Sequence, residues 1–186
     1  QAPDLDGVKL NKDGDYMEKY LAERVDKSDL IGDVVKNWMR IASDRSTVVF
    51  AVNRKHSRHL CQEFLDHGIR AEHLDGETPT GEREQILARV ANGTTQVLCN
   101  VFVATYGLDI PRLSCGVICR PTRNISLYLQ MCGRILRVTE GKVDAKIIDH
   151  AGAVEENGFI DDYIPWSLDS DMTVKERKQA KKEQAK

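Results

Sequence analysis

The sequence predicts an α/β fold in which a mainly parallel central sheet carries helices on both faces. Three observations lead to this prediction. Short apolar runs of strand length recur along the chain, stretches with helical spacing of apolar residues separate them, and the runs are apolar throughout rather than alternating. Strands that are buried on both faces have this continuous apolar character, and their alternation with amphipathic helices is typical of parallel sheets.

Two helices and the first strand are predicted near the amino-terminal end. Apolar residues recur with helical spacing over about 16–27 and 31–42, and the apolar run at 47–52 has the length of a strand. Residues 55–67 form the next predicted helix. We expect it to end at Gly68, because glycine commonly follows the last helical residue.

The same alternation continues along the rest of the domain. Four further strands are predicted at residues 70–74, 96–99, 116–119 and 145–148. Thr78 is predicted to be the N-cap of a helix that has Pro79 at its first position and ends at Asn92-Gly93. Another helix is predicted from about 125 to 138, between the last two strands.

Composition divides the chain into three expected regions. Residues 1–43 form an acidic, helical segment that leads into the α/β domain or joins it to another domain. Residues 44–165 form the α/β domain itself, and residues 166–186 form a polar, basic tail. Because the tail contains few apolar residues, we expect either a solvated, frayed helix or the cut end of a longer chain there.

The overall composition excludes several classes of protein. The chain has 186 residues and a mass of 21.0 kDa, is 41% hydrophobic, and has a mean hydropathy of −0.44, as expected of a globular domain with a core. No apolar stretch approaches the ~20 residues of a spanning helix, so no membrane segment is expected. The net charge of −2 argues against a uniformly basic surface, so any nucleic-acid contact must come from a local patch.

The cysteines and the amino-terminal residues bear on the cellular compartment. Five cysteines without a C-x-x-C pair, most of them within apolar runs, predict buried free thiols in a reducing compartment. The first residues are polar, without the features of a signal peptide, and we therefore expect a cytoplasmic protein. No metal site is expected, because neither the cysteines nor the five histidines have ligand spacing.

The most informative segment for chemistry lies on the helix predicted at 125–138. Gln130, Gly133, Arg134 and Arg137 are spaced at i, i+3, i+4 and i+7, which places them on one stripe of a helix, opposite an apolar face. Two guanidinium groups one turn apart repel each other unless an anion lies before them, and arginine grips phosphate oxygens with two parallel hydrogen bonds. The stripe therefore indicates a phosphate-binding surface.

A second informative segment, residues 105–111, follows the strand predicted at 96–99. In parallel α/β folds, ligands bind outside the carboxyl ends of the strands. Gly107 would allow a close backbone approach, and Asp109 is an acceptor suited to sugar hydroxyls or to a cation of a partner. By itself this G-x-D-x-P pattern is a weak signal, and it gains weight from the arginine stripe about 20 residues later.

Over about residues 46–152 the sequence resembles the second, C-terminal RecA-like domain of superfamily 2 helicases and translocases. Four segments carry the resemblance, in the order of that family's motifs: residues 48–53, 73–78, 105–111 and 130–137. Arg120-Pro-Thr122, Tyr128 and Asp149-His-Ala-Gly152 narrow the resemblance to the DNA-repair, restriction and phage-encoded branch of DEAD/DEAH-type proteins. The resemblance implies a RecA-like three-layer fold.

The resemblance also implies roles at a nucleotide. Arg134 and Arg137 would reach across an interdomain cleft to the γ-phosphate of ATP, with Arg137 as the arginine finger that stabilises charge on the transferring phosphoryl group. Gln130 would link the nucleotide state to neighbouring motifs, and Gly107 and Asp109 would lie at the nucleotide. The cofactor implied is ATP with Mg²⁺, held mainly by an N-terminal RecA-like domain of the same protein, which is the first expected partner.

The second partner implied is a single- or double-stranded nucleic acid, with DNA as the expected substrate. Asn53, Arg54, Thr78 and Thr105 would lie near the phosphate backbone of one strand, where contacts carry no sequence information. The alternative is that these four are ordinary capping residues beside a sheet.

Two features depart from the family's complete pattern. Tyr106 stands where much of the family has an acidic residue or arginine before the glycine of residues 105–111. In addition, neither a G-x-x-x-x-G-K-[ST] loop nor a D-E-x-H or D-E-A-D box occurs in these 186 residues. We therefore expect this chain, taken alone, not to hydrolyse ATP.

Two other functions compete with that of half a motor. One is a non-catalytic nucleic-acid-binding module with a helicase-like fold, in which the arginine pair would have no role in turnover. The other is a nucleotide-sugar or dinucleotide enzyme on a doubly wound sheet. The latter requires a glycine-rich turn after the first strand, but here the strand continues into Asn53-Arg54-Lys55-His56.

Overall fold

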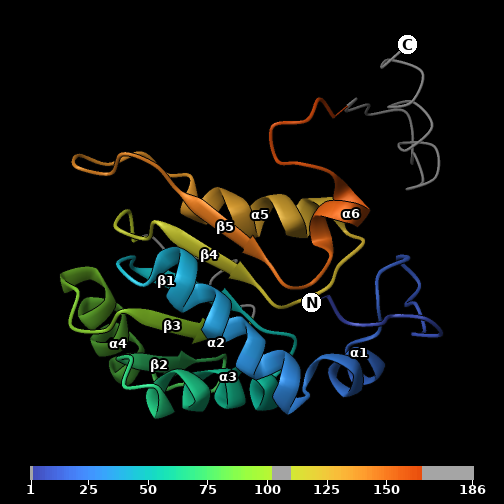
Figure 1. The fold of residues 1–186 in the computed structure, drawn as a ribbon, viewed down its shortest axis with the longest axis horizontal. Helices are drawn as coiled ribbons and strands as arrows, with labels where there is room; N and C mark the ends of the chain where they lie inside the picture. Colours follow the sequence, from blue (N-terminus) through green and yellow to red (C-terminus); the bar gives the residue numbers. More distant parts are fainter. Residues whose placement is uncertain (1, 102–109, 165–186) are drawn as a thin grey trace.

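A computed structural model describes residues 2–101 and 110–164 of the chain. The sheet at its centre has five parallel strands in the order β2-β3-β1-β4-β5 (Figure 1). These strands are β1 (Thr47–Phe50), β2 (Ala71–Leu74), β3 (Val97–Asn100), β4 (Cys115–Ile118) and β5 (Lys146–Asp149). The predicted parallel α/β sheet is confirmed, with each strand within two residues of its predicted ends.

Six helices accompany the sheet in the described residues. They are α1 (Glu18–Val25), α2 (Ser28–Ala42), α3 (Arg54–Asp66), α4 (Thr80–Asn92), α5 (Ile125–Ile135) and α6 (Ala153–Asn157). The predicted helices correspond to α1 to α5, whereas the short α6 was not predicted. Gly68 follows α3 and Gly93 ends α4, each with a positive φ, as the sequence indicated for both helix ends.

The helices cover both faces of the sheet and so give three layers. Alternate residues of a strand point to opposite faces: Val49 packs in a cluster with residues of α2 and α3, whereas Val48 and Phe50 pack with residues of α4, α5 and α6. All four residues of β1, β3 and β4 are buried, which explains why the sequence shows continuous apolar runs there.

Helix α2 belongs to the core of the sheet although it precedes the first strand. Trp38 is 1% exposed, its indole Nε1 donates to Thr47 Oγ1 at 2.8 Å, and its ring meets that of Phe64 edge to face at 5.3 Å between centroids. Helix α1 lies beside the carboxyl end of β1, where Leu21 and Val25 pack against Val52. The boundary at residues 43 and 44 remains a prediction.

Three predicted helix ends are wrong. Helix α2 begins at Ser28 rather than at residue 31, since the N–H of Ile31 already donates to the carbonyl of Lys27. The N-cap of α4 is Pro79 rather than Thr78, because the Thr78 hydroxyl accepts the backbone N–H of Asp75 and belongs to the preceding turn. Helix α5 ends at Ile135 rather than at residue 138, and Leu136 is its C-cap. The predicted helical stripe is therefore shorter, and Arg137 lies beyond the helix.

All five cysteines are buried, as predicted. None of the helices within the described ranges combines the length and apolarity that crossing a membrane requires.

Helix α5 approaches the sheet closely at a glycine. A Cβ atom on Gly116 of β4 would lie 2.7 Å from Cγ1 of Ile135, the last residue of the helix, which is fully buried. The absence of a side chain at residue 116 therefore allows the carboxyl end of α5 to rest directly on the strand.

We predict that Gly116→Val lowers the free energy of unfolding by about 1–3 kcal/mol, because the added methyl groups overpack this contact. Ile135→Ala removes the opposing side chain, so it is expected to cost less in the Gly116→Val background than in the wild type. Urea unfolding of the four proteins measures both effects, and strictly additive losses would contradict the contact.

Candidate functional site

Asn53 and the buried His56 form the start of α3, just beyond the carboxyl end of β1. The Asn53 Oδ1 accepts the backbone N–H of His56 at 2.9 Å, which makes Asn53 the N-cap of the helix. His56 is 2% exposed, and burial lowers its pKa to about 4. Its Nδ1 accepts the Val52 N–H at 3.4 Å, so the neutral ring stabilises the bend into α3.

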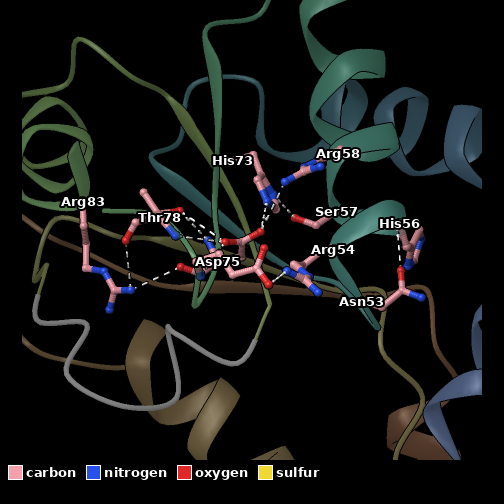
Figure 2. A network of polar contacts seen from close by, with 10 residues as sticks. Asn53, Arg54, His56, Ser57, Arg58, His73, Asp75, Thr78 and Arg83 are labelled. Atoms are coloured by element: carbon pink, nitrogen blue, oxygen red, sulfur yellow. Dashed lines mark hydrogen bonds and ion pairs between the residues drawn. The ribbon is translucent and has the colours of Figure 1, made fainter. Parts of the chain in front are cut away.

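A buried carboxylate organises the turn that follows β2. Asp75 is 2% exposed, and its Oδ1 accepts the backbone N–H groups of Glu77 at 2.9 Å and Thr78 at 3.1 Å (Figure 2). Its Oδ2 lies 2.9 Å from His73 Nε2. Burial opposes ionisation of this carboxyl group, but the His73 and Glu77 hydrogen bonds and the charge of Arg58 prevail, and the pKa of Asp75 is lowered.

The same network reaches α3 through a serine. The hydroxyl of Ser57 lies 2.8 Å from Nδ1 of His73, whose other ring nitrogen faces Asp75. When Nε2 donates its N–H to the carboxylate, Nδ1 is the ring nitrogen that can accept a hydrogen bond from the Ser57 hydroxyl. Although the order resembles that of a Ser-His-Asp triad, Ser57 is 0% exposed and therefore out of reach of any substrate. The chain of hydrogen bonds instead ties α3 to the β2–α4 turn.

An open groove of about 960 Å³ lies over these elements at the carboxyl ends of β1 and β2. Four cationic side chains line it. Arg54, Lys55 and Arg58 come from the first turns of α3, and Arg83 comes from α4. Three acidic residues also line it: Glu18, Asp75 and Glu77. With four cations against three acidic side chains, the groove is slightly basic although the whole chain is not.

Ion pairs within the groove moderate its positive charge. Arg54 forms an ion pair with Glu77, and Arg58 lies 3.7 Å from Asp75 Oδ2. The side chain of Arg54 is 50% exposed and that of Arg58 is 65% exposed, so both remain accessible to a phosphate. Exposed ion pairs of this kind contribute little to stability.

The arginine segment lies at the opposite end of the sheet. Gln130 and Gly133 on α5 are exposed, whereas Arg134 and Arg137 are half-buried. The Nζ of Lys142 donates to the carbonyl groups of Ile135 at 2.5 Å and of Leu113, just before β4, at 2.7 Å. The end of α5 is therefore beside the amino ends of the strands.

The predicted site residues thus fall into two separate groups. Asn53, Arg54 and Thr78 gather at the carboxyl ends of β1 and β2, and the structure does not bring them together with the arginine segment. Thr105, Gly107 and Asp109 lie outside the described residues.

Sequence reasoning missed several residues of the groove and its support. Lys55 and Arg58 could have been found from their spacing with Arg54 on the first turns of a helix. The contacts of Ser57 with His73 and of Lys142 with Leu113 left no local signal, because the partners are 16 and 29 residues apart in the sequence. In the described part of the chain, no cluster of three histidine, cysteine or acidic side chains is arranged to hold a metal ion.

Comparison with known families decides the relationship. Residues 26–139 match the family model described as the helicase conserved C-terminal domain, which is more than half of the chain. This chain belongs to the helicase C-terminal domain family. The resemblance drawn from the four motifs is thereby confirmed.

Relatives of this helicase domain are longer proteins. It is 33% identical over 165 residues to a 51.5 kDa protein of a Lactococcus phage (isolate 7-9), covering 88% of this chain and 36% of that protein. It is 39% identical over 133 residues to irc3 of Schizosaccharomyces pombe, named as a mitochondrial ATP-dependent helicase, covering 71% of this chain and 22% of that protein. The chain thus spans between about a fifth and about a third of these relatives.

Solved structures show the same fold. The DEAD-box protein SrmB of E. coli superposes with a TM-score of 0.61 at 22% identity, covering 80% of this chain and 87% of that one. The C-terminal domain of the DEAD-box protein Dbp5 gives a TM-score of 0.58 at 21% identity, covering 67% and 71%. The predicted RecA-like three-layer fold of the helicase domain is confirmed.

The buried imidazole at the start of α3 makes a testable prediction about pH. Its pKa is 6.5 in the unfolded chain and about 4 in the folded one, so between these values the unfolded state binds more protons. The stability contribution of neutral His56 is complete above pH 6.5 and lost as the pH falls to about 4, a change of roughly 3 kcal/mol. We expect His56→Gln to reduce the dependence of the free energy of unfolding on pH over this range.

The matched control is His67→Gln, at the exposed end of the same helix, which is expected to keep the wild-type pH profile. Urea unfolding at pH 4.5, 5.5 and 7 measures the slope, and an unchanged slope in His56→Gln would show that another group titrates.

Proposed function

We propose that this chain is the C-terminal motor half of an ATP-dependent nucleic-acid helicase or translocase, with DNA as the substrate. The observation that carries the proposal is the division of charge between the two ends of one sheet. A pair of half-buried arginines lies at the amino ends of the strands, and a basic groove lies at the carboxyl ends. Each end suits a different phosphate ligand of a helicase.

The arginine end suits the nucleotide. Arg134 and Arg137 offer two guanidinium groups three residues apart, and neither is fully buried. Bound ATP would supply the phosphoryl group that is transferred to water, with Mg²⁺ assigned to an N-terminal RecA-like domain of the same protein. Arg137 would stabilise the charge that develops on that group. Gln130, exposed one turn before Arg134, would report the nucleotide state to that domain.

Gly133 supports a close approach from outside the chain. It is exposed, and apart from its chain neighbours and the backbone of its own helix no described atom lies within 4 Å of the position that its Cβ would occupy. Packing within the described residues therefore gives no reason for a glycine there, whereas a surface that meets the stripe of Gln130, Gly133 and Arg134 benefits from its small size.

The groove suits a strand of nucleic acid. Phosphates would meet Arg54 and Arg58 and the exposed Lys55, and the Asn53 cap and the turn around Thr78 border the same surface. Contacts of this type bind the backbone without reading sequence, as a motor that steps along any sequence requires. The Asp75 network fixes the relative position of the two elements, so both would follow the strand as one unit.

One prediction of the proposed function concerns ATP turnover. In the full-length protein, Arg137→Ala is expected to lower DNA-stimulated ATP hydrolysis by about 10³- to 10⁵-fold in kcat, as loss of an arginine finger does. Arg40→Ala, an exposed arginine on α2 in the opposite layer, is the matched control and is expected to keep wild-type turnover.

Three results would contradict parts of this proposal. Turnover that is indifferent to Arg137 would place the arginine finger elsewhere, with Arg134 next to be tested. Hydrolysis of Mg-ATP at ordinary rates by this chain alone would refute its role as half of a motor. Absence of turnover in the full-length protein, with strand binding retained, would favour the non-catalytic binding module.

Another prediction of the proposed function concerns binding of single-stranded DNA. Arg54→Ala with Arg58→Ala is expected to weaken binding of this chain to single-stranded DNA and to reduce the slope of log K against log salt by about 0.7 for each phosphate that is no longer bound. Glu77→Gln is expected to act in the opposite direction and strengthen binding, because it releases Arg54 from its ion pair.

Lys36→Ala on α2 removes one exposed positive charge away from the groove and controls for net charge. Fluorescence anisotropy with a labelled oligonucleotide at several salt concentrations measures all four proteins. If Glu77→Gln weakened binding, or Lys36→Ala changed the slope as much as the groove variants, the strand would not lie in this groove.

A further inference from the structure

Lys142 lies after α5 on the segment that leads to β5, and its ammonium group joins three parts of the backbone. Its Nζ donates to the carbonyl of Ile135 at 2.5 Å, to that of Leu113 at 2.7 Å and to that of Arg137 at 2.8 Å. An ammonium group has three N–H donors. Every donor of Lys142 therefore has a backbone acceptor.

Two of the three acceptors belong to residues of the buried core. Ile135 is fully buried, and its side chain contacts β4 at Gly116. Leu113 is also fully buried and lies two residues before that strand. These two carbonyl groups are thus part of the core, and they fix the position of the ammonium group.

Arg137, the third acceptor, lies beyond the end of the helix. The helix ends at Ile135, and the backbone N–H of Leu136 makes its last α-helical hydrogen bond, to Cys132 at 3.2 Å. Helical geometry therefore does not define the position of the next residue. The hydrogen bond from Lys142 to the carbonyl of Arg137 links this residue to the core.

A tight turn returns Lys142 to the end of the helix. The N–H of Lys142 donates to the carbonyl of Thr139 at 3.2 Å, and Gly141 has a φ of +78°, which glycine adopts without strain. The turn places the ammonium group beside carbonyl groups at the negative end of α5, where a cation is favoured.

We propose that Lys142 is a positioning residue that holds the backbone of Arg137 where its guanidinium group meets the nucleotide. The inference rests on the function proposed for Arg137 and adds the group through which the fold controls that arginine. A simple helix cap would need only the carbonyl of Ile135, whereas Lys142 also binds the residue that carries the guanidinium group and the core beneath it.

Lys146 offers a matched control. Its Nζ donates to the carbonyl of Ile41 at 2.7 Å and so ties the end of α2 to the start of β5. Both lysines make half-buried ammonium–carbonyl contacts near the amino ends of the strands, but Lys146 makes this contact with the opposite layer from Arg137. Loss of the Lys142 hydrogen bonds, which affects α5, can thus be compared with loss of the Lys146 hydrogen bond, which does not.

The experiment compares ATP hydrolysis by four variants of the full-length protein: Lys142→Met, Lys146→Met, Arg137→Ala and the double variant Lys142→Met/Arg137→Ala. Methionine is unbranched and of similar length but has no N–H to donate. Lys142→Met is expected to lower kcat by about 10- to 100-fold with little change in KM, because a displaced group loses much of its contribution. Lys146→Met is expected to lower the melting temperature while kcat is kept.

The double variant separates positioning from general damage. If Lys142 acts through Arg137, its loss is expected to have no further effect on kcat once the guanidinium group is absent. A double variant that is slower by the product of the two single effects would overturn the proposal. A Lys142→Met protein with wild-type kcat, or a Lys146→Met protein equally impaired in kcat, would overturn it as well.

Two further measurements keep the test decisive. Should Lys142→Met fail to fold, Lys142→Arg keeps a cation and several donors in a planar arrangement that cannot satisfy three converging carbonyl groups, and kcat is again expected to fall. In this chain, amide hydrogen exchange over residues 136–141 is expected to speed up in the Lys142 variant while exchange in β1 is unchanged. Unchanged exchange in both segments would overturn the positioning role.

Failure of the proposed function gives a different pattern. Wild-type turnover in Arg137→Ala would refute the role of the arginine finger whatever the lysine variants do. A collapse of turnover in Arg137→Ala together with normal turnover in Lys142→Met would refute only the role of Lys142.

Discussion

The close approach of α5 to β4 at Gly116 is the constraint on which the arginine end of this domain depends. Because Gly116 has no side chain, the buried Ile135 packs directly on the strand. This contact sets the distance between the last turn of the helix and the sheet. The carbonyl of Ile135 then becomes one of the acceptors of Lys142. The core thus sets the geometry of the arginine segment as far as Arg137, although that residue itself lies outside any helix or strand.

The other end of the sheet is organised by a buried charge instead of a packing contact. Asp75 gathers two backbone N–H groups and His73, and through the histidine it reaches Ser57 on α3. A carboxylate with this many donors stays ionised in a buried site, because each hydrogen bond offsets part of the cost of its desolvation. The helicase domain therefore holds the two surfaces proposed to bind phosphate by different physical means, with the short strands between them.

The sequence was sufficient for the strands and for most helices, because burial on both faces leaves continuous apolar runs that no other structure explains as well. It was insufficient where a tertiary contact decides a local conformation. Thr78 has the side chain of an N-cap, but Asp75 places its hydroxyl in the preceding turn. Apolar spacing continues to Val138, but α5 ends three residues earlier, and Val138 is 95% exposed. The motifs located Arg134, Arg137 and Arg54, whereas the groups that contact them, Lys142 at the backbone of Arg137 and Glu77 at the side chain of Arg54, became visible only in the structure.

The strand order has a consequence for synthesis on the ribosome. The central strand β1 is made first, but both strands that pair with it, β3 and β4, come later in the chain, with Thr47 opposite Val97 and Cys115. A nascent chain that has just completed α3 therefore carries a strand of the future core, TVVF, with two unpaired edges. Such a strand is a template for wrong pairing. The domain completes its centre only when β4 has left the exit tunnel, so the interval between the synthesis of β1 and that of β4 is the period in which this strand is open to wrong pairing.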